Sequence, residues 1–278
     1  MKIENIKIAD IDDFENHPFH IKDDEDMASL MESIRQNGVL SPIIVRPKEN
    51  SRYEMISGHR RKHACELLGI DTIPATVSEM TREEAVIRMV DSNCHRSVIL
   101  PSEKAFSYKM KYDALKHQGK TTSGPVDQKS SLEEMSENGT DSVKQIQRYI
   151  RLTNLIPELL EYVDNGQMKM RPAVELSYVD EEAQRDVVDR IEEEQAFPSH
   201  DQAIRLRRAF EEGYWSYECV RDIMSELKPN QRNKLTISSQ RVLELIPEGL
   251  TPEETEDFLY KAVYYLRKAL QKQREGGR

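Results

Sequence analysis

A chain of 278 residues is long enough for two or three small domains, and its 32% charged and 37% hydrophobic residues favour a modular, mostly helical protein over one large core. No apolar run approaches the ~20 residues that a membrane-spanning helix needs, and the first residues lack the apolar centre of a signal peptide. The three cysteines, Cys65, Cys94 and Cys219, are odd in number and far apart, which argues against a disulfide framework and predicts a cytoplasmic protein.

The first hundred residues predict a small mixed α/β domain, because short apolar runs alternate with stretches of helical spacing. Strands are expected at residues 3–11, 42–46, 52–56 and 72–77. Helices are expected at 27–37, directly after Gly58, and from Thr81, with Gly38 as a helix stop and Thr81 and Glu84 as a capping box. The predicted domain covers residues 1–99.

From Pro101 onward strand patterns nearly vanish, which predicts a helical domain over residues 100–197 and a helical C-terminal region over residues 198–278. In chain order we expect a helix at 102–116, a loop at 117–131, short helices through 212, a mixed segment at 214–246 and a last helix from about 252 to 274. Apolar residues recur at helical spacing in the last helix, which fits a small core or a dimer seam. The predicted fold class is α+β.

The junction at Gly58 joins an apolar strand to a helix that begins with His59, Arg60 and Arg61 and carries no acid before Glu66. A glycine at such a junction lets the backbone approach a ligand, and the new helix offers free N–H groups and a positive dipole end. Arginines add planar donors that match phosphate oxygens. Cations at a helix N-terminus are mildly unfavourable without an anion. The residues therefore predict a bound phosphate, with a solvated basic first turn as the alternative.

A zinc site is a second interpretation of this helix. His59 and His63 are four residues apart and could be joined by Cys65, Cys94 or His95. However, the run lacks the glutamate of a metalloprotease helix, and the cations between the two histidines would repel a dication. The sequence therefore disfavours a zinc site here.

Residues 131–152 predict a helix–turn–helix. A short helix is expected to stop at 138–139, and Asp141 or Ser142 can cap the next one. In that second helix Val143, Ile146 and Ile150 form the buried stripe. The residues expected to meet DNA are Ser142, Lys144, Gln145, Gln147, Arg148 and Arg151. The alternative is an ordinary helical hairpin with a solvated face.

The net charge of −10 does not exclude DNA, because charge is unevenly distributed along the chain. Acids crowd residues 4–26 and 180–194, whereas residues 142–157 contain three cations and no acid. The tail at 261–278 is also basic. We therefore expect a local basic surface on an acidic protein.

Four blocks in this order resemble ParB-type partition proteins of plasmids and integrative elements of low-GC Gram-positive bacteria. They are residues 34–47 (IRQNGVLSPIIVRP), 58–64 (GHRRKHA), 91–96 with 100–103 (DSNCHR and LPSE), and the helix–turn–helix with 151–157 (RLTNLIP). The second block stands in the place of the family's Gly-Glu-Arg-Arg signature. The third stands in the place of its Glu-Asn-x-x-Arg…Pro-x-Glu signature.

The resemblance implies a homodimer that binds CTP with Mg²⁺ and closes into a sliding clamp on double-stranded DNA at a centromere-like site. It also implies a ParA-type ATPase as partner and a location on the nucleoid or a plasmid. By this resemblance the nucleotide-binding residues are Gly38, Ser41, Pro42, Gly58, His59, Arg60, Arg61, Asn93 and Arg96. The candidate Mg²⁺ ligands are Asn93 and Asp91. The ParA partnership is implied by the family alone.

Three departures from the family pattern limit what the resemblance implies, and the third bears on hydrolysis. His59 replaces the glutamate of the second block, Ser41 replaces a glutamine, and Ser92 stands where the family has its metal-linked glutamate. Asp91 is adjacent, but neighbours on a helix point about 100° apart. We therefore expect nucleotide binding with weak or absent CTP hydrolysis, and no catalytic residue is assigned.

Two other functions remain open. One is a transcriptional repressor of a mobile element without nucleotide switching, which nucleotide-dependent retention on DNA would separate from a clamp. The other is a nucleotide-using enzyme with the ParB fold, similar to sulfiredoxin or to small kinase-like enzymes. The helix–turn–helix argues against that enzyme, as does Cys65, which lies within the helix rather than before the arginine pair.

Overall fold

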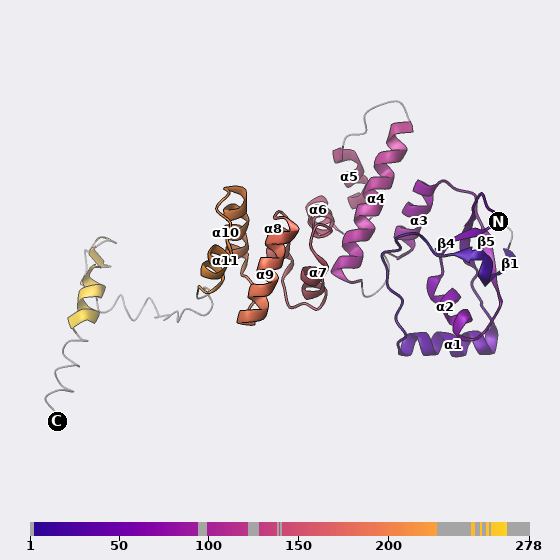
Figure 1. Cartoon of the computed structure of the whole chain (residues 1–278), viewed down its shortest axis with the longest axis horizontal. Helices are drawn as coiled ribbons and strands as arrows, with labels where there is room; N and C mark the ends of the chain where they lie inside the picture. The colour runs from indigo at the N-terminus through magenta and orange to yellow at the C-terminus, as the bar shows by residue number, and fades with distance from the viewer. Residues whose placement is uncertain are drawn as a thin grey trace, which may run out of the picture. The chain divides into compact units, whose positions relative to one another are not determined.

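The structure is a computed structural model that describes residues 3–93, 99–121, 128–137, 139, 141–226, 246–247, 251, 254–255 and 257–265. Met1–Glu226 form one compact unit and Leu227–Arg278 form a second. The first unit begins with a strand-containing domain and continues as helices (Figure 1). The expected α+β class is confirmed.

Five short strands form one mixed sheet in the order β1-β5-β3-β4-β2. They are β1 (Ile3–Lys7), β2 (Ile11–Asp12), β3 (Ile43–Pro47), β4 (Tyr53–Ser57) and β5 (Thr72–Val77). The single strand expected at residues 3–11 is wrong, because a 3-10 turn at Ile8–Asp10 interrupts it. The turn is needed because β1 pairs with β5 at one edge of the sheet, whereas β2 pairs with β4 at the other.

Helices cover both faces of the sheet. The first three are α1 (Glu25–Asn37), α2 (His59–Leu67) and α3 (Arg82–Asn93). Met55 belongs to the core formed with α1 and α2, and its neighbour Ile56 belongs to the core formed with α3. Successive strand residues point to opposite faces, so α1 and α2 lie on one face and α3 lies on the other. The capping box of α3 is also confirmed, since Thr81 and Glu84 exchange hydrogen bonds of 2.9 and 3.2 Å.

Helix α4 (Pro101–Thr121) contributes to more than one core. Ala114 and Met110 pack in the core of α3, whereas Tyr108 and Leu115 pack with α5 (Gln128–Glu137) and α6 (Val143–Leu152). The loop expected at residues 117–131 is therefore wrong at both ends. One glycine inside a helix costs only about 1 kcal/mol, so Gly119 does not end α4.

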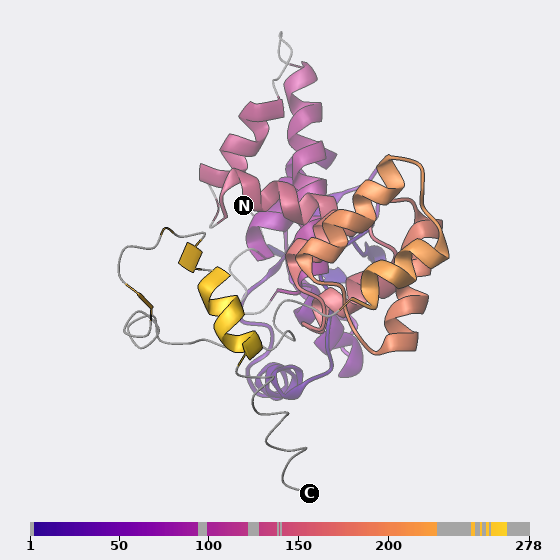
Figure 2. The same ribbon diagram turned by 90° about the vertical axis from the view of Figure 1, so that its left-hand side faces the viewer.

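The remaining helices of the first unit are α7 (Pro157–Asp164), α8 (Met170–Leu176), α9 (Glu181–Glu194), α10 (His200–Glu211) and α11 (Tyr217–Met224). In both views α8, α9, α10 and α11 lie side by side (Figures 1 and 2). A buried amide ties this group to the end of α6: Gln184 accepts from Ile156 N at 2.8 Å and donates to Asn154 O at 3.0 Å.

In the second unit, residues 257–265 are helical, within the predicted last helix. The rest of that expected helix, and residues 227–245 of the expected mixed segment, lie outside the described residues. Within the described part of the chain, no helix combines the length and apolar character required to cross a bilayer.

The buried carboxylate of Glu103 joins the start of α4 to the segment around His20, which is far away in the sequence. One oxygen accepts from His20 N at 2.8 Å and the other from Leu100 N at 3.0 Å. We expect Glu103→Ala to lower the free energy of unfolding by about 2–4 kcal/mol, because it leaves two N–H groups without their acceptor. Urea unfolding measures the loss, with Glu134→Ala on the exposed face of α5 as the control. Equal midpoints for both variants would contradict the assignment.

Candidate functional site

The first candidate site is built on the turn at Gly58, where β4 ends and α2 begins. Gly58 has φ 108° and ψ 19°, a left-handed conformation that L side chains rarely adopt. A Cβ at this position would lie only 2.6 Å from Cγ2 of Ile43, which is fully buried in β3. The backbone of the turn therefore lies directly against the sheet, and the first N–H groups of α2 begin there.

Arg61 joins this turn to the loop that follows α1. Its Nη1 donates to the carbonyl oxygen of Ser41 and, at 2.8 Å, to that of Pro42. Burial lowers the pKa of Arg61. Nη2 lies 3.1 Å from the place that a Gly58 Cβ would occupy. Four of the expected nucleotide-binding residues thus meet here, and the side chain of Arg61 joins Ser41 and Pro42 to the turn at Gly58.

Arg60 points to a different partner. Its Nη2 lies 3.5 Å from Oδ1 of Asp24, the residue that caps the N-terminus of α1. The Arg60 side chain is 36% exposed, so its guanidinium is within reach of a ligand in solvent. Gly38, another expected site residue, ends α1 with φ 71°.

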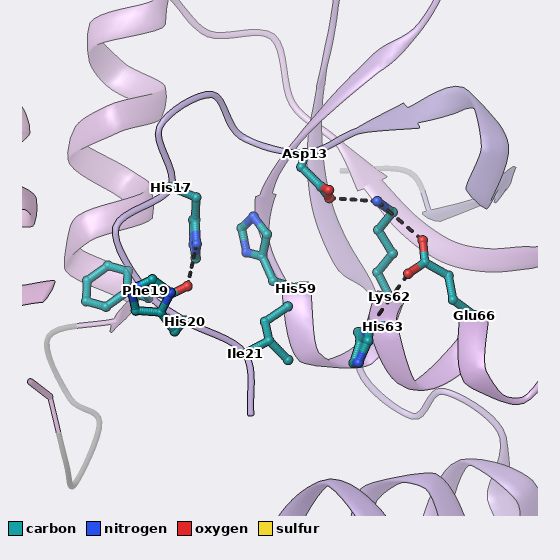
Figure 3. Close-up of a pocket in the computed structure, with 9 residues that line it drawn as sticks. All are labelled: Asp13, His17, Phe19, His20, Ile21, His59, Lys62, His63 and Glu66. Atoms are coloured by element: carbon teal, nitrogen blue, oxygen red, sulfur yellow. Dashed lines mark hydrogen bonds and ion pairs between the residues drawn. The ribbon is translucent and has the colours of Figure 1, made fainter. Parts of the chain in front are cut away.

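His59 lies in a pocket beside the turn (Figure 3). Its ring is stacked on that of His17, with centroids 3.8 Å apart and an interplanar angle of 34°. The pocket has a volume of about 280 Å³ and is lined by Asp13, His17, Phe19, His20, Ile21, His59, Lys62, His63 and Glu66. Among the described residues, no three His, Cys, Asp or Glu side chains are grouped as a metal site.

The third block lies at the end of α3. Asp91 forms an ion pair with Lys111 Nζ at 2.5 Å, and Asn93 Nδ2 donates to Met89 O at 2.9 Å. Ser92 Oγ also donates to Met89 O, at 2.9 Å. Within the described residues, neither Asp91 nor Asn93 forms a hydrogen bond or ion pair with the Gly58 turn. Arg96 lies outside the described residues.

The second candidate site is the helix–turn–helix of α5 and α6. Ser142 caps α6 by accepting from Gln145 N, which selects one of the two expected caps. The preceding Asp141 anchors the turn to α4, since its Oδ2 lies 2.5 Å from Lys104 Nζ and accepts from Tyr108 OH at 2.6 Å. The turn is therefore fixed by a non-local contact as well as by its own cap.

The exposed face of α6 carries amides and cations. Lys144, Gln147 and Arg148 are exposed, whereas Ile146 is buried beneath them. Gln145 is half-buried, and its Nε2 lies 3.1 Å from Sδ of Met170 at the start of α8. Lys144, Gln147 and Arg148 are therefore exposed as the sequence predicts, whereas Gln145 is partly covered by the start of α8.

Arg151 differs from its expected outward position. Its Nη2 donates to Ser177 O at 2.9 Å, and its guanidinium lies 3.8 Å from the ring centroid of Tyr178. Arg207 of α10 lies 3.7 Å from the same centroid. Two guanidinium groups cannot share one face of one ring, so Tyr178 is held between them. The expectation of a solvent-facing Arg151 is wrong, because Tyr178 and Ser177 offer it a stacking surface and an acceptor.

Sequence reasoning missed Asp24, His17, Tyr178 and Arg207. The sequence did carry a signal for Asp24. Acids are concentrated at residues 4–26 and cations at the start of α2, and segments of opposite charge attract each other. For Tyr178 and Arg207 the local sequence carried no signal, because their partner lies on another helix.

Residues 1–94 match the ParB N-terminal domain. Stage 0 sporulation protein J of Bacillus subtilis is 33% identical over 170 residues, which cover 60% of this chain and 55% of that protein. The chain thus spans about half the length of this relative. Caulobacter crescentus ParB complexed with CTP-gamma-S is 24% identical, covering 64% of this chain and 92% of that one, with a TM-score of 0.32. The same protein complexed to the centromeric parS site is 19% identical, covering 80% and 98%, with a TM-score of 0.42.

The close approach at Gly58 can be tested with a second glycine as a matched control. Gly58→Ala should lower the free energy of unfolding by about 2–4 kcal/mol, because it adds a clash with Ile43 to the strain of a positive φ. Gly69 also has a positive φ, 67°, but a Cβ there meets no atom within 4 Å. Gly69→Ala should therefore cost only about 1 kcal/mol. Equal losses in urea unfolding would show that the approach to β3 is not tight.

Proposed function

Because the chain carries a ParB N-terminal domain at residues 1–94, we propose that it is a ParB-type partition protein that uses a nucleotide to control its hold on double-stranded DNA. The observation that carries the proposal is the presence of two kinds of site in one compact unit. One is the left-handed turn at Gly58 at the start of α2, whose first turn contains no acid, and the other is a helix–turn–helix with an acid-free exposed face. Its target would be a centromere-like site on a plasmid or other mobile element.

The nucleotide part of the proposal rests on the fit of the Gly58 turn to a phosphate group. The turn has no side chain, the first turn of α2 contains no acid, and Arg60 and Arg61 flank its N–H groups. Backbone N–H groups and a guanidinium are the donors that phosphate oxygens prefer. Arg60 would bind the phosphates directly, and Arg61 would keep the Ser41–Pro42 loop beside them. The choice of CTP comes from the family resemblance.

The residues at the end of α3 fit a bound Mg²⁺ only in part. The carboxamide oxygen of Asn93 is a suitable ligand. The carboxylate of Asp91 is held by Lys111 and would have to leave that ion pair first. The Ser92 hydroxyl donates to its own helix and cannot replace a carboxylate base. We therefore propose that nucleotide binding proceeds with weak or absent hydrolysis.

The DNA part of the proposal assigns roles to the exposed Lys144, Gln147 and Arg148 and to the half-buried Gln145 of α6. Gln145 and Arg148 would reach base edges in the major groove, and Lys144 and Gln147 would contact bases or adjacent phosphates. Arg151 would set the position of the helix, because it is fastened to Ser177 and Tyr178. A homodimer, a ParA-type partner and a location on the nucleoid or a plasmid belong to the proposal through the resemblance alone.

A repressor that ignores nucleotide is the second candidate, and the same helix–turn–helix would support it. The two functions differ in one measurable property. A clamp is retained on closed circular DNA in a nucleotide-dependent way, whereas a repressor is retained equally with and without CTP. The alternative of a ParB-fold enzyme leaves α5 and α6 without a role.

We expect Arg60→Ala to weaken CTP binding by about one to two decades, because a charge-assisted hydrogen bond is worth ~1.5–3 kcal/mol. Isothermal titration of the full chain with CTP and Mg²⁺ measures the change. Arg35→Ala removes an exposed arginine from the neighbouring α1 and should leave the affinity unchanged. Absence of heat with the wild-type chain, and of competition with radiolabelled CTP, would overturn the nucleotide proposal.

Arg148→Ala should weaken binding to the cognate DNA by about 1–3 kcal/mol and relax the preference at one base pair, if Arg148 contacts a guanine. Arg185→Ala on α9 removes one exposed arginine from another helix and serves as the charge control. Fluorescence anisotropy against cognate and scrambled duplexes measures both. If Arg148→Ala and Arg185→Ala behave alike, α6 is not the helix that reads DNA.

A further inference from the structure

Residues 13–24 form a segment that lies along the basic side of α2. Four contacts join the two: Asp13 with Lys62 at 2.6 Å, His17 with His59 at 3.8 Å between ring centroids, Asp23 with His63 at 2.8 Å, and Asp24 with Arg60 at 3.5 Å. The side chains of Asp13, His17, Lys62 and His63 in Figure 3 show how this segment and the helix face each other. Arg60, Lys62 and His63 are thus already paired with acids of the same chain, whereas Arg61 is bonded to two backbone carbonyl groups.

Asp24 is the acid that faces Arg60, the residue that we propose binds the phosphates. The same oxygen, Oδ1, accepts from Met27 N at 2.9 Å as the cap of α1 and lies 3.5 Å from Arg60 Nη2. The second distance is longer than the 2.7–2.9 Å of a strong charge-assisted hydrogen bond. The cap therefore fixes the carboxylate, and Arg60 is attracted to it without being tightly bound.

We propose that Asp24 occupies the place of an anion at Arg60 and thereby sets the affinity of the chain for nucleotide. This inference rests on the proposed nucleotide binding at the Gly58 turn. An incoming phosphate competes with Asp24 for Arg60, and moving the carboxylate away would break its capping hydrogen bond to Met27 N. The negative charge of Asp24 then lies close to the phosphate that binds Arg60. The repulsion between the two lowers the affinity of the chain for nucleotide.

Asp24→Asn removes the negative charge but keeps the helix cap, because asparagine caps helices about as well as aspartate. We expect this variant to bind CTP with Mg²⁺ about two- to fivefold more tightly, the upper part of the range of an exposed ion pair. Its melting temperature should stay close to that of the wild-type chain. Inorganic triphosphate should gain by the same factor, whereas cytidine, which has no phosphate, should gain nothing.

Two further variants sharpen the test. Asp24→Ala removes the charge and the cap together, so it should show the same gain in affinity with a lower melting temperature. Asp26→Asn makes the same change in net charge two residues away, at an exposed position with no ion pair among the described residues, and should gain less than twofold.

Each other outcome has a distinct meaning. An equal gain for Asp24→Asn and Asp26→Asn would assign the effect to net charge and overturn the role of Asp24. Unchanged affinity for Asp24→Asn, while Arg60→Ala loses binding, would overturn this inference and leave the proposed function standing. If the wild-type chain and Asp24→Asn both fail to bind CTP, the proposed nucleotide binding fails and the inference fails with it.

Discussion

The approach of the backbone at Gly58 to β3 is the constraint on which the candidate phosphate site depends. Because no side chain intervenes, α2 starts directly against the sheet, and its free N–H groups are fixed by the strands beneath them. Arg61 can then reach back to the carbonyl groups of Ser41 and Pro42 and hold the loop that follows α1 against the same turn. A wider turn would move the helix away from the sheet and separate these residues.

Internal ion pairs explain how an acidic chain can carry basic sites. Asp12 accepts hydrogen bonds from Arg52 and Lys48, which lower its pKa to about 2. Glu54 is buried between Arg46 and Arg82, with oxygen–nitrogen distances of 2.6 Å to each. Each of these acids is paired with two cations of the same chain. The net charge of −10 is therefore a poor guide to partners, and the local surface of α6 is a better one.

Local signals predicted the elements that depend on local chemistry. The strand at Thr72–Val77, the helix stop at Gly38 and the cap at Ser142 are all found where the sequence places them. The turn at Ile8–Asp10 could not be predicted, because it depends on which strands pair at the two sheet edges. Arg151 was misplaced for a related reason, since its stacking partner belongs to another part of the helical region. The spacing of apolar residues identifies which face of a helix points away from its own core. It does not show which side chains of other helices pack on that face.

The two-sided packing of α4 has a consequence for how the chain can be divided. Met110 and Ala114 form one stripe and Tyr108 and Leu115 another, and each stripe completes a different core. The two cores therefore share α4 along its length. No single peptide bond separates the residues of one core from those of the other. A one-residue insertion within α4 would rotate everything after it by about 100° and detach one stripe from its core. Exchange of segments between related chains would thus have to keep the helical phase of α4, and we expect the two cores completed by these stripes to unfold as one cooperative unit.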